Sequence, residues 1–103
     1  MVQIKLEDLE KQGINKGCLV EVILKQGVIP NLRTMALVSY FGPEKDTGKP
    51  STTKYSGYIK MEEDEGGIAL LPGWDDQLKR YPKDARIGGV YIDLDAVYSC
   101  VKK

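Results

Sequence analysis

Short apolar runs, most of them alternating with polar residues and separated by glycine and proline, constrain this chain more than any other feature of its sequence. Alternation of this kind buries one face of a strand, so each such run predicts a short β-strand. The run 33–42 is apolar on both faces and is bounded by prolines, which predicts a strand covered on both sides. The ranges that predict strands, the last of which holds two, are 18–25, 33–42, 55–62, 68–71 and 88–103.

One short helix is predicted, and it lies at the N-terminus. Leu6 and Leu9 are three residues apart among charged residues, and Gly13 is a favoured helix stop. No pattern typical of a crossover helix follows. One helix followed by five or six short strands predicts an all-β fold with a short N-terminal helix, in which a strongly bent antiparallel sheet closes into a small barrel.

The length of 103 residues predicts a single domain, 1–103. Residues 43–54 are rich in proline, glycine and hydroxyl side chains, which predicts a loop. Asp75 is positioned to cap one helical turn that ends before Pro82. Trp74 follows a Pro-Gly break and is expected to cover one end of the barrel.

Histidine is absent from the chain. Its absence removes Ser-His-Asp and Cys-His catalytic arrangements and histidine metal ligands. No glycine-rich phosphate loop follows a strand, and the paired carboxylates lie on predicted tips and loops. The sequence therefore predicts a protein that is not an enzyme and that needs no metal or other cofactor.

The two cysteines, Cys18 and Cys100, lie near opposite ends of the sequence. Their spacing permits a bridge, but two thiols without a secretory leader favour reduced packing residues. The longest uncharged runs are far shorter than the roughly 20 apolar residues that span a bilayer. We therefore expect a cytoplasmic protein with no membrane partner.

Charge is balanced overall but unevenly distributed, with 15 basic and 15 acidic residues. The acidic block 62–65 predicts a solvated hairpin tip rather than a cation site. A basic cluster follows the 68–71 strand. The plainer interpretation is a solvated loop that one aromatic residue anchors. The functional interpretation is a site that binds phosphates and stacks a tyrosine on a base. The cluster comprises Lys79, Arg80, Tyr81, Lys83 and Arg86, with lesser help expected from Lys45, Lys49 and Lys54.

Three stretches resemble the Sm-like family of small barrels, whose members commonly form RNA-associated rings. The predicted helix followed by 17-GCLVEVILKQG-27 is similar to the family's opening, a helix leading into a strand of the form V-x-V-x-L-x-x-G. Residues 55–70 match the rest of the first Sm motif in spacing, and residues 90–101 resemble the second. The matches within 55–70 are Tyr55, Gly57 and Ile59 at Y-x-G-x-L, Glu63 at the Asp position, Gly67 at the Asn position and Leu70 at the closing Leu.

The resemblance implies an Sm-like barrel with an inserted strand and loop. Residues 28–54 have no counterpart in the typical motif, so they would be inserted between the first two barrel strands. An alternative alignment makes 33–42 the second barrel strand and displaces the rest.

The family's RNA pocket is altered in this chain. Typical members hold a base near the central pore between an aromatic or hydrophobic residue, an Asn and the basic residue of an apolar-basic-glycine tripeptide. Here the tripeptide is Ile92-Asp93-Leu94, so an anion replaces the cation and the glycine is missing. Gly67 has no side chain to bond a base edge, and Glu63 lies in the acidic block. The usual uridine pocket is therefore expected to be absent.

Self-association is the other property that the resemblance implies. Tyr91, Tyr98 and Cys100 are expected to face away from the core and to be exposed on an isolated barrel. In the Sm-like arrangement the last strand of one subunit pairs with the preceding strand of the next, and such a head-to-tail contact can close into a ring. We predict a cyclic homo-oligomer with these three residues at its interface.

Three hypotheses follow. The leading one is a non-enzymatic, Sm-like, ring-forming protein that binds RNA, if at all, through a face other than the usual pore pocket. The alternative is a protein-interaction or assembly module on the same barrel, without nucleic acid. The third is a monomeric five-stranded barrel of unrelated ancestry. Binding measured across salt separates the first two, because phosphate contacts are strongly salt-dependent, and the mass in solution separates the third.

Overall fold

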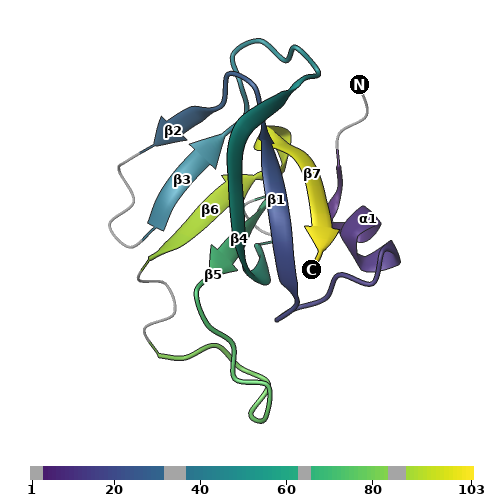
Figure 1. Ribbon diagram of the computed structural model, residues 1–103, viewed down its shortest axis with the longest axis vertical. Helices are drawn as coiled ribbons and strands as arrows, with labels where there is room; N and C mark the ends of the chain where they lie inside the picture. Colours follow the sequence, from purple (N-terminus) through teal and green to yellow (C-terminus); the bar gives the residue numbers. More distant parts are fainter. Residues whose placement is uncertain (1–3, 32–36, 63–65, 84–87) are drawn as a thin grey trace.

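The computed structural model describes residues 4–31, 37–62, 66–83 and 88–103 of the chain (Figure 1). Half of these residues lie in strands, and one short α-helix precedes them, which confirms the all-β class with an N-terminal helix. The elements are α1 (Leu6–Lys11), β1 (Leu19–Lys25), β2 (Ile29–Asn31), β3 (Leu37–Phe41), β4 (Pro50–Glu62), β5 (Gly67–Leu71), β6 (Gly89–Asp93), the 3-10 turn η2 (Leu94–Ala96) and β7 (Val97–Lys102).

Helix α1 begins and ends where its sequence signals predict. The backbone N–H of Lys5 donates to the carboxylate of Asp8 at 3.0 Å, which satisfies a free donor of the first turn. Gly13 takes the left-handed conformation, with φ of 80°, and Ile14 N–H donates to the carbonyl of Leu9 at 2.9 Å. This is a Schellman ending, and it turns the buried side chains of Leu9 and Ile14 into the core.

The strands form one sheet in the order β2-β3-β6-β5-β4-β1-β7 (Figure 1). Strand β4 carries the bend of the sheet, because its first part pairs with β1 and its last part pairs with β5. The hydroxyls of Tyr40 on β3 and Tyr55 on β4 are hydrogen-bonded although two strands separate β3 from β4 in the order. The predicted strong bend is therefore confirmed.

The predicted closed, wholly antiparallel barrel is wrong in two respects. Strand β3 pairs with β6 in parallel, from Leu37 opposite Gly89 to Tyr40 opposite Ile92, whereas the other strand pairs are antiparallel. Within the part of the chain that the structure describes, β2 and β7 end the sheet and do not pair with each other. The cause is the insertion, which returns to the sheet beside β6.

The insertion also differs from its prediction in detail. The run 33–42 forms strand only over Leu37–Phe41 within the described residues, and Val38 and Phe41 are exposed because only β2 lies beyond β3. The predicted loop 43–54 is shorter, since β4 begins at Pro50. Pairing of β1 with β4 overrides the loop signals there, with Lys25 opposite Pro50. The alternative alignment with 33–42 as the second barrel strand is not supported, because β1 pairs with β4 and β7.

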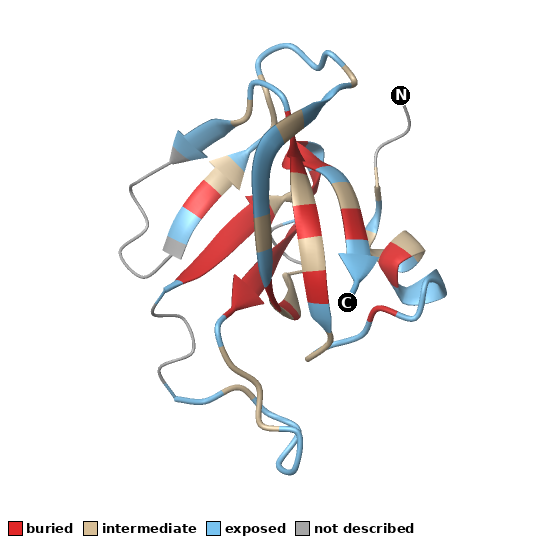
Figure 2. Ribbon diagram, in the orientation of Figure 1, coloured by how far each residue is buried: buried red, intermediate tan, exposed pale blue. Residues whose placement is uncertain are grey.

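Two apolar clusters hold the sheet (Figure 2). The larger lies on the concave side, where Val20, Val22 and Leu24 of β1 are buried as their alternation predicts. The smaller cluster covers the opposite face of β5 and β6 and consists of Ala69, Leu71 and Tyr91, with Tyr81 packed against it. No helix in the described ranges is long and apolar enough to cross a membrane.

Candidate nucleic-acid interface

Residues 72–83, which follow β5, leave the sheet and protrude at one end of the molecule (Figure 1). We call this segment the 72–83 loop. Asp75 and Arg80 pair across it, with N···O distances of 2.8 and 3.3 Å, and the carboxylate of Asp75 accepts the N–H groups of Gln77 and Leu78 at 3.0 Å. The predicted helical turn is therefore wrong: Asp75 caps a closed turn instead, and Lys79 completes it at a φ of 52°.

Tyr81 anchors this loop to the sheet. Its hydroxyl donates to the backbone oxygen of Ile59, and its ring packs against the small cluster on β5 and β6. Burial raises the pKa of Tyr81 to about 12. Stacking of Tyr81 on a base stays a prediction. These contacts show that its hydroxyl and part of its ring already have partners within the chain.

Trp74 forms the second anchor and brings an additional cation to the loop. Its ring stands edge-on to Tyr81, with centroids 4.8 Å apart. Its indole lies on the backbone of Gly17, because a Cβ there would come within 2.6 Å of the indole Cδ2. The ammonium of Lys16 lies 6.0 Å from the Trp74 ring and 5.8 Å from the Tyr81 ring, within cation–π range. Trp74 therefore packs on the turn before β1, and the sequence gives no signal for Lys16 at this place.

The cations of the predicted cluster are exposed where the structure describes them. Arg80 and Lys83 line a hollow of about 190 Å³ together with Tyr81 and Asp75, whereas Lys16 lines a different hollow with Glu10 and Lys60. Lys79 lies at the turn and pairs with Asp76 at 2.8 Å, and this hydrogen bond lowers the pKa of the Asp76 carboxyl. Arg86 lies outside the described residues. The structure thus places Arg80 and Lys83 in one hollow with Tyr81, and the Lys16 ammonium 5.8 Å from the Tyr81 ring.

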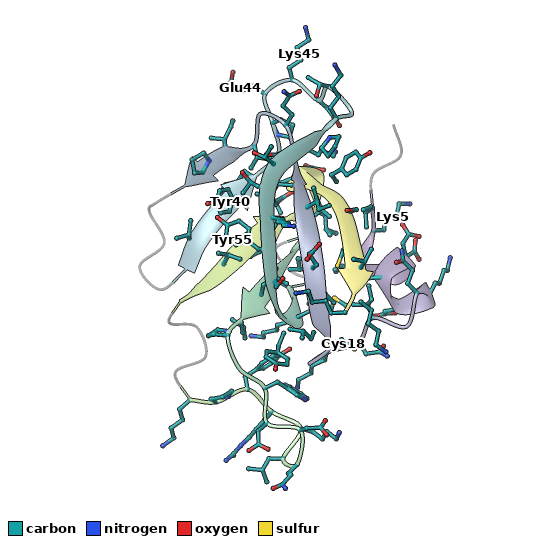
Figure 3. The ribbon with its side chains drawn as sticks, viewed as in Figure 1. Lys5, Cys18, Tyr40, Glu44, Lys45 and Tyr55 are labelled. Atoms are coloured by element: carbon teal, nitrogen blue, oxygen red, sulfur yellow. The ribbon has the colours of Figure 1, made fainter. Side chains whose placement is uncertain are left out.

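The predicted helper lysines lie elsewhere. Lys45 and Lys49 are on the loop between β3 and β4, at the opposite end of the 41 Å long axis from the 72–83 loop (Figures 1 and 3). Lys54 is exposed on the first part of β4. They do not extend the surface around Tyr81.

Local packing explains the residues at the positions that the resemblance aligns with the family's RNA pocket. A Cβ at Gly67 would lie 2.6 Å from Cζ of Tyr91, so this position holds no side chain. The carboxylate of Asp93 accepts the N–H of Asp95 at 2.9 Å and caps η2, and burial raises the pKa of Asp93. Leu94 is buried in the core. Glu63 lies outside the described residues.

The expected exposure of Tyr91 and Cys100 is wrong. They are 6% and 4% exposed, whereas Tyr98 is 37% exposed. The register between β1 and β7 shifts, with Ile23 opposite Ser99 and Leu24 opposite Val97, so Tyr98 is an extra residue in a bulge. The bulge changes the phase of the alternation and turns Cys100 inward. Tyr91 is covered because the small cluster and Phe41, at 6.2 Å between ring centroids, pack around it.

The outer edge of β6 is occupied within the chain. Strand β6 pairs with β5 on one side and with β3 on the other. The head-to-tail pairing that the family resemblance implies would bring the β7 edge of one copy to this β6 edge. In this structure such a pairing would have to displace β3.

A hollow of about 440 Å³ lies beside the loop between β3 and β4, away from the 72–83 loop. It is lined partly by the ion pair of Lys25 and Asp46, whose charged atoms are 2.9 Å apart. Within the described ranges, no group of three or more histidine, cysteine or acidic side chains is placed to hold a metal ion.

No family model, no curated protein and no solved structure matches the chain. The resemblance to the Sm-like family therefore depends on the three sequence stretches alone.

Proposed function

We propose that this chain is a non-enzymatic, Sm-like RNA-binding domain that contacts single-stranded RNA through the 72–83 loop and Lys16. The observation that carries this function is that Arg80 and Lys83 share a hollow with the half-buried Tyr81, while the Lys16 ammonium lies 5.8 Å from the ring of that tyrosine. Cations on a surface of this kind bind phosphates, and aromatic rings among them favour unpaired bases.

The anchoring of the loop favours binding by its cations, because it fixes the backbone that carries them. Tyr81 is fixed by its hydroxyl and its ring, and Trp74 is fixed on Gly17. Lysine and arginine side chains on a loop held in this way lose less conformational entropy on binding than those on a free segment. Trp74 is only partly buried, so part of its surface remains for contact with a base.

The arrangement of the strands supports the Sm-like assignment. The three stretches that resemble the family form β1, the paired part of β4 with β5, and β6 with β7. These five strands are consecutive neighbours in the sheet, and the insertion adds β2 and β3 beyond one of them. A ring made by pairing β7 with β6 of the next copy is not part of this function, because β3 occupies that edge.

The proposed place of action is the cytoplasm. Cys18 and Cys100 are both free thiols, and Cys100 is buried. Unpaired thiols of this kind are typical of reducing compartments.

The direct test is binding of a fluorescently labelled single-stranded RNA of mixed sequence. The variant Lys79→Glu/Arg80→Glu reverses two charges on the loop, and Lys45→Glu/Lys49→Glu makes the same change in net charge at the opposite end of the molecule. We expect the first variant to bind at least about tenfold more weakly and the second to bind within about twofold of wild type. Undiminished binding by the first variant would reject this interface.

A protein-interaction module is the second candidate, and one observation favours it. Apart from Leu78 on the 72–83 loop, the exposed large apolar side chains of the described residues lie near the two ends of the sheet, on β2 and β3 and on β1 and β7. They comprise Ile29, Val38 and Phe41 near one end and Leu19, Tyr98 and Val101 near the other. A chain that binds no RNA at low salt and instead captures a protein partner through either group would favour this candidate.

A further inference from the structure

The two strands that end the described sheet differ in their capacity to accept another strand. Strand β2 has three residues, and its central residue is Pro30, which has no N–H. A short edge that carries proline resists further pairing. Strand β7 has six residues, contains no proline and pairs on one side only, with β1. The β7 edge is therefore the open one.

Strand β7 presents apolar side chains beside this edge. Val101 is 52% exposed and Tyr98 is 37% exposed, the latter because of the bulge opposite β1. Exposed apolar side chains on an unpaired strand favour pairing with another chain.

The charges that flank β7 indicate which chain would pair with its open edge. Asp93 and Asp95 precede the strand, and Lys102 and Lys103 end it. When two copies of such a strand pair antiparallel, the acidic beginning of each lies against the basic end of the other. Parallel pairing would bring like charges together. The strand is thus complementary to itself in the antiparallel direction.

We propose that β7 pairs antiparallel with β7 of a second copy across a twofold axis, which makes the protein a homodimer with one continuous sheet. Val101 and Tyr98 of each copy then lie in the contact, and the Lys102–Lys103 end of each strand lies beside the Asp93–Asp95 turn of the other. The contact is isologous, so each favourable pair occurs twice.

The first test is the mass in solution of wild type, Val101→Lys and Val38→Lys, measured by sedimentation equilibrium. Val101 is 52% exposed and lies opposite Glu21 on β1, which also pairs with Lys103 at 3.9 Å, so a lysine there faces solvent and a carboxylate within the protomer and is compatible with its fold. Val38 is 38% exposed on β3 and serves as the matched control. We expect a dimer in wild type and in Val38→Lys, and dissociation at least about tenfold easier in Val101→Lys, because the substitution puts an ammonium group from each copy into the apolar contact.

The second test uses the flanking charges. Lys103→Glu should weaken the dimer, and adding Asp95→Lys should restore it, because the exchanged charges again oppose each other. A single protomer at every soluble concentration of wild type would overturn the inference. Failure of Asp95→Lys to rescue Lys103→Glu would overturn the antiparallel pairing.

Hydrogen exchange keeps the inference testable without any variant. Amides of β7 that face the open edge should become more protected as the concentration of wild-type protein rises, while those of β2 should not. A dimer whose β7 amides exchange at a rate independent of concentration would contradict this interface.

Discussion

The ring of Tyr91 occupies the space that a side chain at position 67 would need. A Cβ built on Gly67 lies 2.6 Å from Cζ of Tyr91 and 2.7 Å from the carbonyl oxygen of Ile92, closer than ordinary contacts allow. The asparagine of the Sm motif is therefore incompatible with a buried tyrosine at position 91. The difference from the Sm motif at position 67 and the packing of the small cluster on β5 and β6 have the same cause.

Introducing an asparagine at position 67 is expected to destabilise the protein. Gly67→Asn should lower the free energy of unfolding by about 1–3 kcal/mol, because overpacking forces the Tyr91 ring or the backbone to move. Urea denaturation measures this change. Gly66→Asn is the control, since nothing lies within 4 Å of a Cβ there and asparagine tolerates its left-handed backbone, with φ of 69°. Equal stability of Gly67→Asn and wild type would contradict the packing.

The raised pKa values of two tyrosines predict that the stability of the protein falls at alkaline pH. Burial raises the pKa of Tyr55 and of Tyr81 to about 12, above the value of roughly 10 in an unfolded chain. Their contribution is fully present below pH 10 and is lost as the pH rises to about 12, because the unfolded state releases these protons first. Tyr55→Phe/Tyr81→Phe should make the pH dependence of the urea midpoint shallower, and Tyr98→Phe should leave it unchanged. Identical pH profiles for the double variant and wild type would refute this assignment.

Two ion pairs of similar length test the role of burial. Lys25–Asp46 and Lys79–Asp76 are 2.9 and 2.8 Å long, but the side chain of Lys25 is 8% exposed and that of Lys79 is 70% exposed. Asp46→Asn should lower the thermal midpoint clearly, because it leaves a buried ammonium without its counter-ion, whereas Asp76→Asn should change it little.

The Lys25–Asp46 ion pair also makes the stability of the protein depend on pH in the acid range. The hydrogen bond from Lys25 lowers the pKa of Asp46 from its usual value of 3.8, so the stabilising contribution is present above that pH and is lost as the pH falls through the lowered value. Thermal melts between neutral and acid pH would show this loss in wild type and not in Asp46→Asn. A larger effect of Asp76→Asn than of Asp46→Asn would contradict the role of burial.

The elements with local signals were predictable from sequence. Gly13 ends α1, the alternation of Val20, Val22 and Leu24 defines β1, and Gly66, with φ of 69°, precedes β5. In each case neighbouring residues in the chain decide the structure, so the pattern is visible without knowledge of the tertiary fold.

The features that depend on distant contacts were not predictable in this way. The parallel pairing of β3 with β6 joins segments from opposite halves of the chain, and nothing in 33–42 indicates its partner. The bulge at Tyr98 reverses the expected exposure of Cys100, since one extra residue changes which face each side chain takes. In the candidate site, the basic cluster was predictable from its composition, whereas Lys16 joins it only because Trp74 packs on Gly17.

The salt dependence of RNA binding tests the proposed function most directly. If Lys16, Arg80 and Lys83 each neutralise one phosphate, the logarithm of the association constant should fall with the logarithm of salt concentration with a slope of about −2. Lys16→Glu/Lys83→Glu leaves only Arg80 to neutralise a phosphate and should bring that slope to about −0.7, and Lys45→Glu/Lys49→Glu should leave it near −2. A wild-type protein whose RNA binding shows no salt dependence, or a slope that both double variants reduce equally, would contradict an RNA interface at the 72–83 loop.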